Sequence, residues 1–200
     1  GKAPLLVSAL MYTNPMMIYF GQELGEKGMD AEGFSGEDGR TTIFDYWTVD
    51  TIRRWRNNGK FDQKLLTEDE LSLQEYYAKV LNICNSSEAV REGEFYDLMY
   101  VNPQLQKQYT FVRHSENETL LVIANFASQE TEITINVPEH LFEYYGIKEN
   151  TACEWTDLLS GSQITTAFSS NMPTKLNVPS WGGCILKMKS VKKAGKKTKS

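Results

Sequence analysis

The polar residues best placed to do chemistry follow directly on a short apolar run. The run is residues 16–20, and Gln22 and Glu23 come two and three positions after its end. A glycine-rich, acidic segment then continues past Arg40. In parallel β-sheets, ligand-binding groups sit just beyond the carboxyl ends of the strands. We therefore expect Gln22, Glu23 and the polar segment to Arg40 to lie at the ligand-binding edge of such a sheet.

The run itself has the composition of a strand buried on both faces. It is entered through Pro15, closed by Gly21, and apolar throughout residues 16–20. Continuous apolar strands of this kind are typical of parallel sheets. Residues 3–13 are apolar nearly all round and predict a short buried helix that leads into the strand.

Other catalytic schemes lack the residues they need. Glu23 and Asp38 are not expected to form a catalytic pair, because nothing in the sequence holds the two carboxyl groups together; a loop anchor and a turn residue are the expected roles. The two histidines, His114 and His140, have no serine or cysteine arranged as a nucleophile and are expected at the surface. The acidic segment at 21–46 fits neither an EF-hand nor a phosphate-binding loop, so no metal site is predicted.

Helices are expected next, followed by a long series of strands. A compact helix is predicted over residues 48–58 and a second over 67–85, which opens with the capping box Thr67-Glu68-Asp69-Glu70. We expect Trp55, Tyr76 and Tyr77 to pack in the interior. The hydrophobic period changes from helical to alternating at residues 85–87. Eight β-rich runs follow and predict a Greek-key β-sandwich: 95–101, 108–114, 119–126, 130–137, 151–159, 162–168, 174–178 and 183–189.

Residues 15–25, Pro-Met-Met-Ile-Tyr-Phe-Gly-Gln-Glu-Leu-Gly, resemble the last barrel strand of the alpha-amylase family of glycoside hydrolases. The segments 93–95, 110–113 and 120–126 resemble the strands that open that family's carboxyl-terminal domain. The sequence departs from the family at Asn85, where an arginine is usual. The resemblance extends over essentially the whole chain.

The resemblance implies an α+β chain made of two parts and a tail. Residues 1–86 would be the incomplete carboxyl-terminal end of a (β/α)8 catalytic barrel, residues 87–190 an all-β Greek-key sandwich, and residues 191–200 a lysine-rich tail. The β-domain would cap the barrel by burying the apolar faces of the helices at 48–58 and 67–85. The missing amino-terminal barrel portion would be its partner.

The resemblance also implies where catalysis occurs. The family's catalytic carboxylates lie on earlier barrel strands, and no position here matches their motifs, so no catalytic residue is assigned. The parent enzyme would hydrolyse or transglycosylate α-1,4-glucans by the retaining, two-carboxylate route, and this chain alone would be inactive. Tyr19, Gln22, Glu23 and Arg40 would lie at the rim of the sugar cleft. The chain would hold no cofactor, although the parent could bind calcium.

Two other hypotheses stay open. The sandwich could be a stand-alone carbohydrate-binding module that stacks sugars on coplanar, exposed aromatic rings, with Trp155, Trp181 or the pair Tyr144 and Tyr145 as platforms. The alternation around Trp155 counts against it, because it is typical of a core residue. The chain could also be a complete small protein, but the apolar strand at 16–20 would then lack neighbours.

Composition excludes several function classes. The chain is 40% hydrophobic with a formal charge of −5, and five of its lysines lie in the last nine residues, so the body without them stands at −10. An acidic body argues against nucleic acid, and no apolar run approaches the roughly 20 residues that cross a membrane. Cys84, Cys153 and Cys184 show no CxxC spacing and predict reduced structural thiols without a zinc site. Unpaired cysteines favour a cytoplasmic location, with secretion left open.

Overall fold

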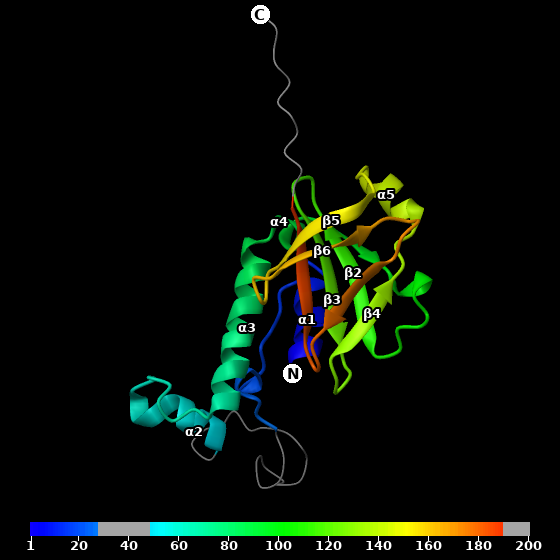
Figure 1. Ribbon diagram of the computed structural model, residues 1–200. Coiled ribbons are helices and arrows are strands. Elements are labelled where there is room, and N and C mark those ends of the chain that lie inside the picture. The colour runs from blue at the N-terminus through cyan, green and yellow to red at the C-terminus, as the bar shows by residue number, and fades with distance from the viewer. Residues whose placement is uncertain (28–48, 190–200) are drawn as a thin grey trace, which may run out of the picture.

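Two β-sheets and a layer of helices make up the part of the chain that the computed structural model describes, residues 1–27 and 49–189 (Figure 1). The α-helices are α1 (Lys2–Leu10), α2 (Asp50–Arg56), α3 (Glu68–Ser86), α4 (Glu88–Arg91) and α5 (Glu139–Tyr145), and the 3-10 helices are η1 (Gln22–Leu24), η2 (Asn57–Gly59) and η3 (Met99–Val101). The strands are β1 (Glu94–Asp97), β2 (Gln108–His114), β3 (Thr119–Asn125), β4 (Thr131–Ile135), β5 (Asn150–Asp157), β6 (Gln163–Phe168), β7 (Thr174–Val178) and β8 (Gly183–Met188).

The eight predicted β-rich runs each contain one strand, so the predicted sandwich is confirmed. Six strands form an antiparallel sheet in the order β1-β2-β3-β8-β5-β6, and β4 pairs with β7 in a second sheet. The chain crosses between the sheets after β3, β4, β6 and β7, and β8 returns between β3 and β5, as Greek-key links do. One apolar core lies between the sheets and includes Leu121, Ile135, Trp155 and Leu186.

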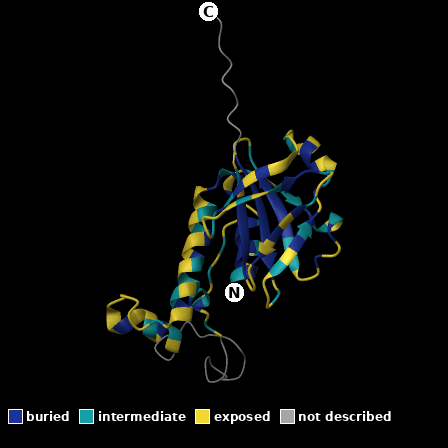
Figure 2. Ribbon diagram, viewed as in Figure 1, coloured by how far each residue is buried: buried dark blue, intermediate teal, exposed yellow. Residues whose placement is uncertain are grey.

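The six-stranded sheet is covered on its other face by helices. Leu6 of α1 and Val80 of α3 pack in one apolar cluster with Leu120, Val122 and Ile185 of the sheet. Every residue of β3 is therefore buried, as Figure 2 shows for the centre of the sheet. Burial on two faces explains why the sequence of β3 is continuously apolar instead of alternating.

Helix formation follows the predicted signals in α1 and α3. The Thr67 hydroxyl accepts a hydrogen bond from the Glu70 amide at 3.2 Å, and the Glu70 carboxylate accepts one from the Thr67 amide at 2.9 Å. This reciprocal pair is the predicted capping box, which satisfies two amides of the first turn. The two short helices α4 and α5 were not predicted, because four and seven residues are too few to show a helical period.

The predicted strand at residues 16–20 is wrong. These residues form no strand, and their backbone pairs with no other strand in the described ranges. The side chain of Met17 is 79% exposed, whereas Met16 and Ile18 pack against the cluster under α1 and α3. A strand requires a neighbour for its amides and carbonyls. The local sequence pattern cannot supply that neighbour.

The predicted packing of the helices needs two further corrections. Helix α2 does not contact the sheets; it lies away from them beside the start of α3 (Figure 1). Its buried residue Ile52 belongs to a separate small cluster with Leu24 and Val49. Trp55 is partly exposed and packs edge-on against Phe61 at 5.0 Å, so its expected interior position is wrong. Tyr76 and Tyr77 do pack in the interior, as predicted.

A buried guanidinium joins the helices to the sheet. Arg113 of β2 is 2% exposed and donates hydrogen bonds to four backbone carbonyls: Ala89 at 3.1 Å, Val90 at 2.9 Å, Gly93 at 2.8 Å and Met11 at 2.9 Å. Burial lowers the pKa of Arg113 from its ordinary value. The four acceptors lie just past α1, within α4 and before β1, so one side chain fixes three chain segments.

A buried carboxylate fixes the same region from the other side. Glu118, in the β2–β3 hairpin, accepts hydrogen bonds from the Ser87 hydroxyl at 2.5 Å and the Ala89 amide at 2.9 Å, and pairs with Lys187 at 2.5 Å. Burial alone would raise the pKa of Glu118, but the hydrogen bonds from Lys187, Ser87 and Ala89 outweigh it and the pKa is lowered. The ionised form is thus the one that the fold stabilises.

Replacing Arg113 with methionine should destabilise the chain by about 3 kcal/mol or more, because it leaves four carbonyls near the helix ends without a donor. Urea unfolding measures the change. The control is Arg91→Met, whose side chain is 52% exposed and pairs only with Glu92, so a change within about 0.5 kcal/mol is expected. Equal effects of the two substitutions would contradict the role given to Arg113.

The lowered pKa of Glu118 predicts a loss of stability in acid. A carboxyl group whose pKa is lower in the folded state stabilises the fold fully above its unfolded pKa of about 4.3 and loses that contribution as the pH falls through the folded pKa. Unfolding free energies measured between about pH 7 and pH 3 should therefore fall less steeply in Glu118→Gln than in the parent chain. The exposed neighbour Glu116→Gln is the control; a Glu118→Gln profile parallel to the parent's would contradict the account.

Candidate functional site

The described residues predicted to lie at the cleft rim are held in one turn beside α3. The Tyr19 amide donates to the Gln22 side-chain oxygen at 3.1 Å, and the Gln22 amide group donates to the Tyr77 hydroxyl at 3.1 Å. Tyr19 is 49% exposed, while Gln22 and Glu23 are half-buried. The structure thus brings Tyr19, Gln22 and Glu23 together, and Gln22 ties them to the helix. Arg40 and Asp38 lie outside the described residues, as does the tail 191–200.

Two glycines make this turn possible. Gly21 and Gly25 flank η1 with φ angles of 78° and 76°, in the left-handed region. A Cβ atom at Gly21 would also lie 2.7 Å from the Cβ of Glu26. Only glycine satisfies both conditions without strain. The turn places Glu26 toward α2, where its carboxylate accepts a hydrogen bond from the Thr51 hydroxyl at 2.5 Å.

An ion pair between α2 and α3 stands next to this turn. The Nε of Arg54 lies 3.1 and 3.0 Å from the two carboxylate oxygens of Glu70, and its Nη2 lies 2.5 Å from Oε1. The bond from Arg54 lowers the pKa of Glu70, which is buried and also closes the capping box. The pair therefore couples the position of α2 to the start of α3. Sequence reasoning missed it, because Glu70 was identified only as part of the capping box and nothing distinguishes Arg54 from its charged neighbours.

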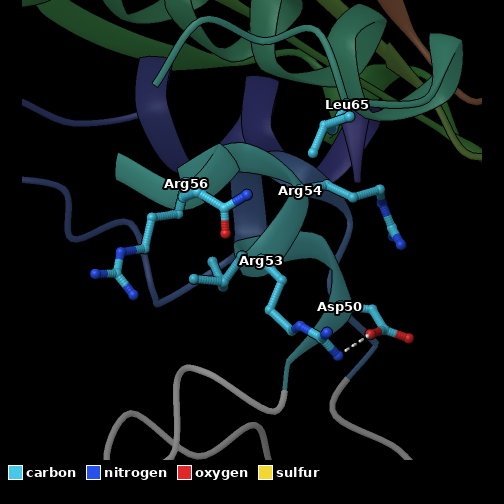
Figure 3. A pocket seen from close by; sticks show the side chains of 7 residues that line it. Asp50, Arg53, Arg54, Arg56 and Leu65 are labelled. Carbon is cyan, nitrogen blue, oxygen red and sulfur yellow. Dashed lines mark hydrogen bonds and ion pairs between the residues drawn. The ribbon is translucent and has the colours of Figure 1, made fainter. Parts of the chain in front are cut away.

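Cavities lie on both sides of Arg54. One of about 440 Å³ is lined by residues of η1, of the segment that follows it, and of α2 and α3, including Glu26, Lys27 and Glu70. Another of about 480 Å³ is lined by Arg53, Arg54 and Arg56 together with Asp50, Ile52, Asn58 and Leu65. Figure 3 shows Arg53 directed at Asp50, 3.4 Å away, with Arg54 and Arg56 pointing to opposite sides of the helix. Two of the three arginines are paired with carboxylates, Arg53 with Asp50 and Arg54 with Glu70, so their charges are partly compensated.

The described carboxyl groups with a shifted pKa are stabilised in their ionised form. Each described carboxyl group whose pKa departs from its ordinary value has it lowered: Asp62, Glu70, Glu118 and Glu149. A general acid for glycoside cleavage needs a raised pKa. Within the described ranges, no group of three or more histidine, cysteine, aspartate or glutamate residues is placed to hold a metal ion.

Histidines and cysteines have the following places. His114 is half-buried, and its Nδ1 lies 2.8 Å from the Thr119 hydroxyl. Burial lowers the pKa of His114. Its predicted surface position is wrong, because the Tyr145 ring covers it with the ring centroids 4.4 Å apart. His140 is exposed, as predicted.

All three cysteines are free, as predicted, and burial raises the pKa of Cys84 and Cys153 to about 11 and that of Cys184 to about 12.

The aromatic residues proposed as sugar platforms do not form an exposed, coplanar group. Trp155 is completely buried against Phe168, with the rings at 87°, so it cannot bind a ligand. Trp181 is 59% exposed. Tyr144 is exposed but tilted by 57° from Tyr145, so the two are not coplanar. Tyr144 instead belongs to a different group of exposed rings that the sequence did not reveal.

The described residues contain no helix that is both long enough and apolar enough to cross a membrane.

Comparison with solved structures finds chains of the same fold. A variant of AmyP in complex with maltotriose superposes with a TM-score of 0.61 at 14% identity, over 94% of this chain and 34% of the AmyP chain. A noncanonic maltogenic alpha-amylase, AmyB from Thermotoga neapolitana, gives a TM-score of 0.57 at 15% identity, over 93% of this chain and 36% of AmyB. Isomaltulose synthase from Klebsiella sp. LX3 gives a TM-score of 0.53 at 19% identity, over 94% of this chain and 38% of the synthase chain.

No protein-family model matches the sequence, and a search of curated proteins found no match. The chain spans about a third of the length of the solved structures it resembles. At these identities the similarity establishes the fold, and the chain folds as about one third of an alpha-amylase-type enzyme does.

Proposed function

We propose that this chain is the carboxyl-terminal part of an alpha-amylase-type glycoside hydrolase that acts on α-1,4-glucans. The observation that carries the proposal is the asymmetry of the structural match, which covers 92–94% of this chain but only 31–38% of its neighbours. Two of those neighbours are in complex with maltose and maltotriose. The sequence of residues 15–25 agrees, because it resembles a barrel strand of that family.

The amino-terminal part of the chain would complete the barrel. Several large apolar side chains of this part are exposed, with Met17 at 79%, Phe61 at 53% and Leu65 at 50%. Exposed apolar groups in such number favour contact with another surface. The amino-terminal barrel portion would cover them, and pairing with a neighbouring strand there would supply what residues 16–20 need to become a strand. The β-sandwich would cap this assembly through α1 and α3.

The parent enzyme would cleave by the retaining route. One carboxylate attacks the anomeric carbon while a carboxylic acid protonates the leaving oxygen; the same acid residue, now a base, then activates the water that releases the sugar. Both carboxyl groups would lie on strands outside this chain. The contribution of this chain would be positional: Gln22 holds Tyr19 and the η1 turn against Tyr77, where they would border the sugar cleft. Arg40 and a calcium ion in the parent enzyme stay predictions.

Expression of the chain together with the residues encoded upstream of Gly1 tests the proposal. The extended polypeptide should release reducing sugar from maltoheptaose with retention of the α-anomer, as followed by NMR, whereas the isolated chain should not. A folded extended polypeptide that leaves both maltoheptaose and starch intact would overturn the proposal. Digestion of starch by the isolated chain at an ordinary enzymatic rate would overturn it too.

A second test concerns the positional role of Gln22. In the extended enzyme, Gln22→Ala should lower kcat/KM for maltoheptaose by about tenfold, because the η1 turn loses its bond to Tyr77. The matched control is Gln106→Ala, an exposed glutamine in the loop before β2, which should leave kcat/KM unchanged. Equal kinetics in the two variants would show that Gln22 does not position the turn.

A further inference from the structure

A group of aromatic rings, three of them exposed and one half-buried, lies where three segments of the chain meet. Tyr96 comes from β1, Tyr100 from η3, and His140 and Tyr144 from α5. The Tyr96 ring centroid is 6.4 Å from that of Tyr100, 6.0 Å from His140 and 6.4 Å from Tyr144. His140 and Tyr144 stack with an interplanar angle of 22°. We call these four residues the Tyr96 cluster.

The cluster is exposed because α5 turns one face to the core and the other to solvent. Leu141 and Phe142 are buried between the sheets, whereas His140 and Tyr144, one helical turn apart, lie on the outer face. Tyr144 is 56% exposed and Tyr100 is 62% exposed. Large rings gathered at a surface in this way mark sites of interaction. Tyr96 itself is half-buried and packs against the core between the sheets, so it anchors the three exposed rings.

The rings are held in place before any ligand arrives. The Tyr96 hydroxyl lies 2.9 Å from the Tyr100 hydroxyl and 2.9 Å from Nδ1 of His140. Tyr145 supports Tyr96 from below, edge-on at 5.9 Å. A preorganised surface loses less conformational entropy on binding than mobile side chains do. Tyrosine adds large contact area with few rotatable bonds.

The chemistry of the cluster selects the class of ligand. The surrounding charges are acidic: Glu139 and Glu143 are exposed on α5, and a hydrogen bond to Glu94 raises the pKa of Tyr144. Anionic ligands such as phosphates are therefore disfavoured. The cluster offers ring faces bordered by hydroxyl, imidazole and carboxylate groups. A pyranose matches this surface, since its C–H face stacks on rings while its hydroxyl groups form hydrogen bonds at the edge.

We propose that the Tyr96 cluster is a binding surface for α-glucan oligosaccharides. The carbohydrate class follows from the chemistry of the cluster, and the choice of α-glucan rests on the proposed function. Figure 1 places α5 at the end of the molecule opposite to α2 and the η1 turn. A glucan chain bound at α5 would therefore be held by the β-sandwich itself.

Titration of the ¹⁵N-labelled chain with maltoheptaose, followed by NMR, tests the proposal. The amide signals of residues 94–101 and 139–146 should shift with a millimolar dissociation constant. The double variant Tyr100→Ala, Tyr144→Ala should bind at least about tenfold more weakly, which corresponds to the loss of binding residues at the centre of a site. Both side chains are exposed, so the spectra of the variant should retain the dispersion of a folded chain.

The matched control is Trp181→Ala, which removes an equally exposed ring at the start of β8 and should leave the dissociation constant unchanged. Three results would overturn the proposal: no shifts with maltoheptaose, shifts confined to other residues, or loss of binding in Trp181→Ala but not in the double variant. A tetralysine peptide that shifts these signals when maltoheptaose does not would assign the cluster to a basic partner instead.

The titration is independent of catalysis. If the extended enzyme cleaves maltoheptaose but the cluster does not bind it, the proposed function stands and this inference fails. If the cluster binds maltoheptaose but the extended polypeptide is inactive, this inference stands and the proposed function fails.

Discussion

The guanidinium of Arg113 is the interaction on which the arrangement of helices and sheet depends. It is buried, it pairs with no carboxylate among the described residues, and the dipoles of four backbone carbonyls stabilise its charge. Burying a charge in this way is tolerated only when the donors are well satisfied. The geometry also requires Gly93, since a Cβ atom there would lie 2.4 Å from the carbonyl oxygens of Ala89 and His114. The hydrogen bonds of Arg113 and the close approach of the backbone at Gly93 thus occur at the same place.

The parts of the described chain on either side of Arg113 differ in how tightly they are packed. The six-stranded sheet has an apolar core on each face, and α1 and α3 share one of these cores. Helix α2 and the η1 turn depend on a much smaller cluster, on the Arg54–Glu70 pair and on the bond from Thr51 to Glu26. The residues proposed to border a sugar cleft therefore belong to the less densely packed end of the described chain. In the proposed enzyme, contacts with the rest of the barrel would make up this difference.

Sequence patterns predicted what is decided locally. The capping box at Thr67 and the strands of the sandwich are specified by residues a few positions apart. The same reasoning failed at residues 16–20, because an apolar run has the composition of a buried strand whether or not a neighbour is present. It also failed to find Arg113 and the Tyr96 cluster. The most distant partner of Arg113 lies 102 positions away, and the cluster joins residues 96 and 100 to residues 140 and 144, which no short-range spacing relates. Gln22 was singled out because it follows an apolar run and lies in a segment that resembles a family motif, although the run is not a strand in this structure.

The place of β8 has a consequence for how the chain acquires its fold. This last described strand lies between β3 and β5 and joins β1-β2-β3 to β5-β6. Until it arrives, each half of the large sheet presents an unpaired inner edge, and Leu121 and Ile123 lack their neighbours Leu186 and Cys184. During synthesis, the growing polypeptide would therefore carry two half-sheets with unpaired edges until β8 has left the ribosome. Nascent chains should depend on chaperones until β8 has been made.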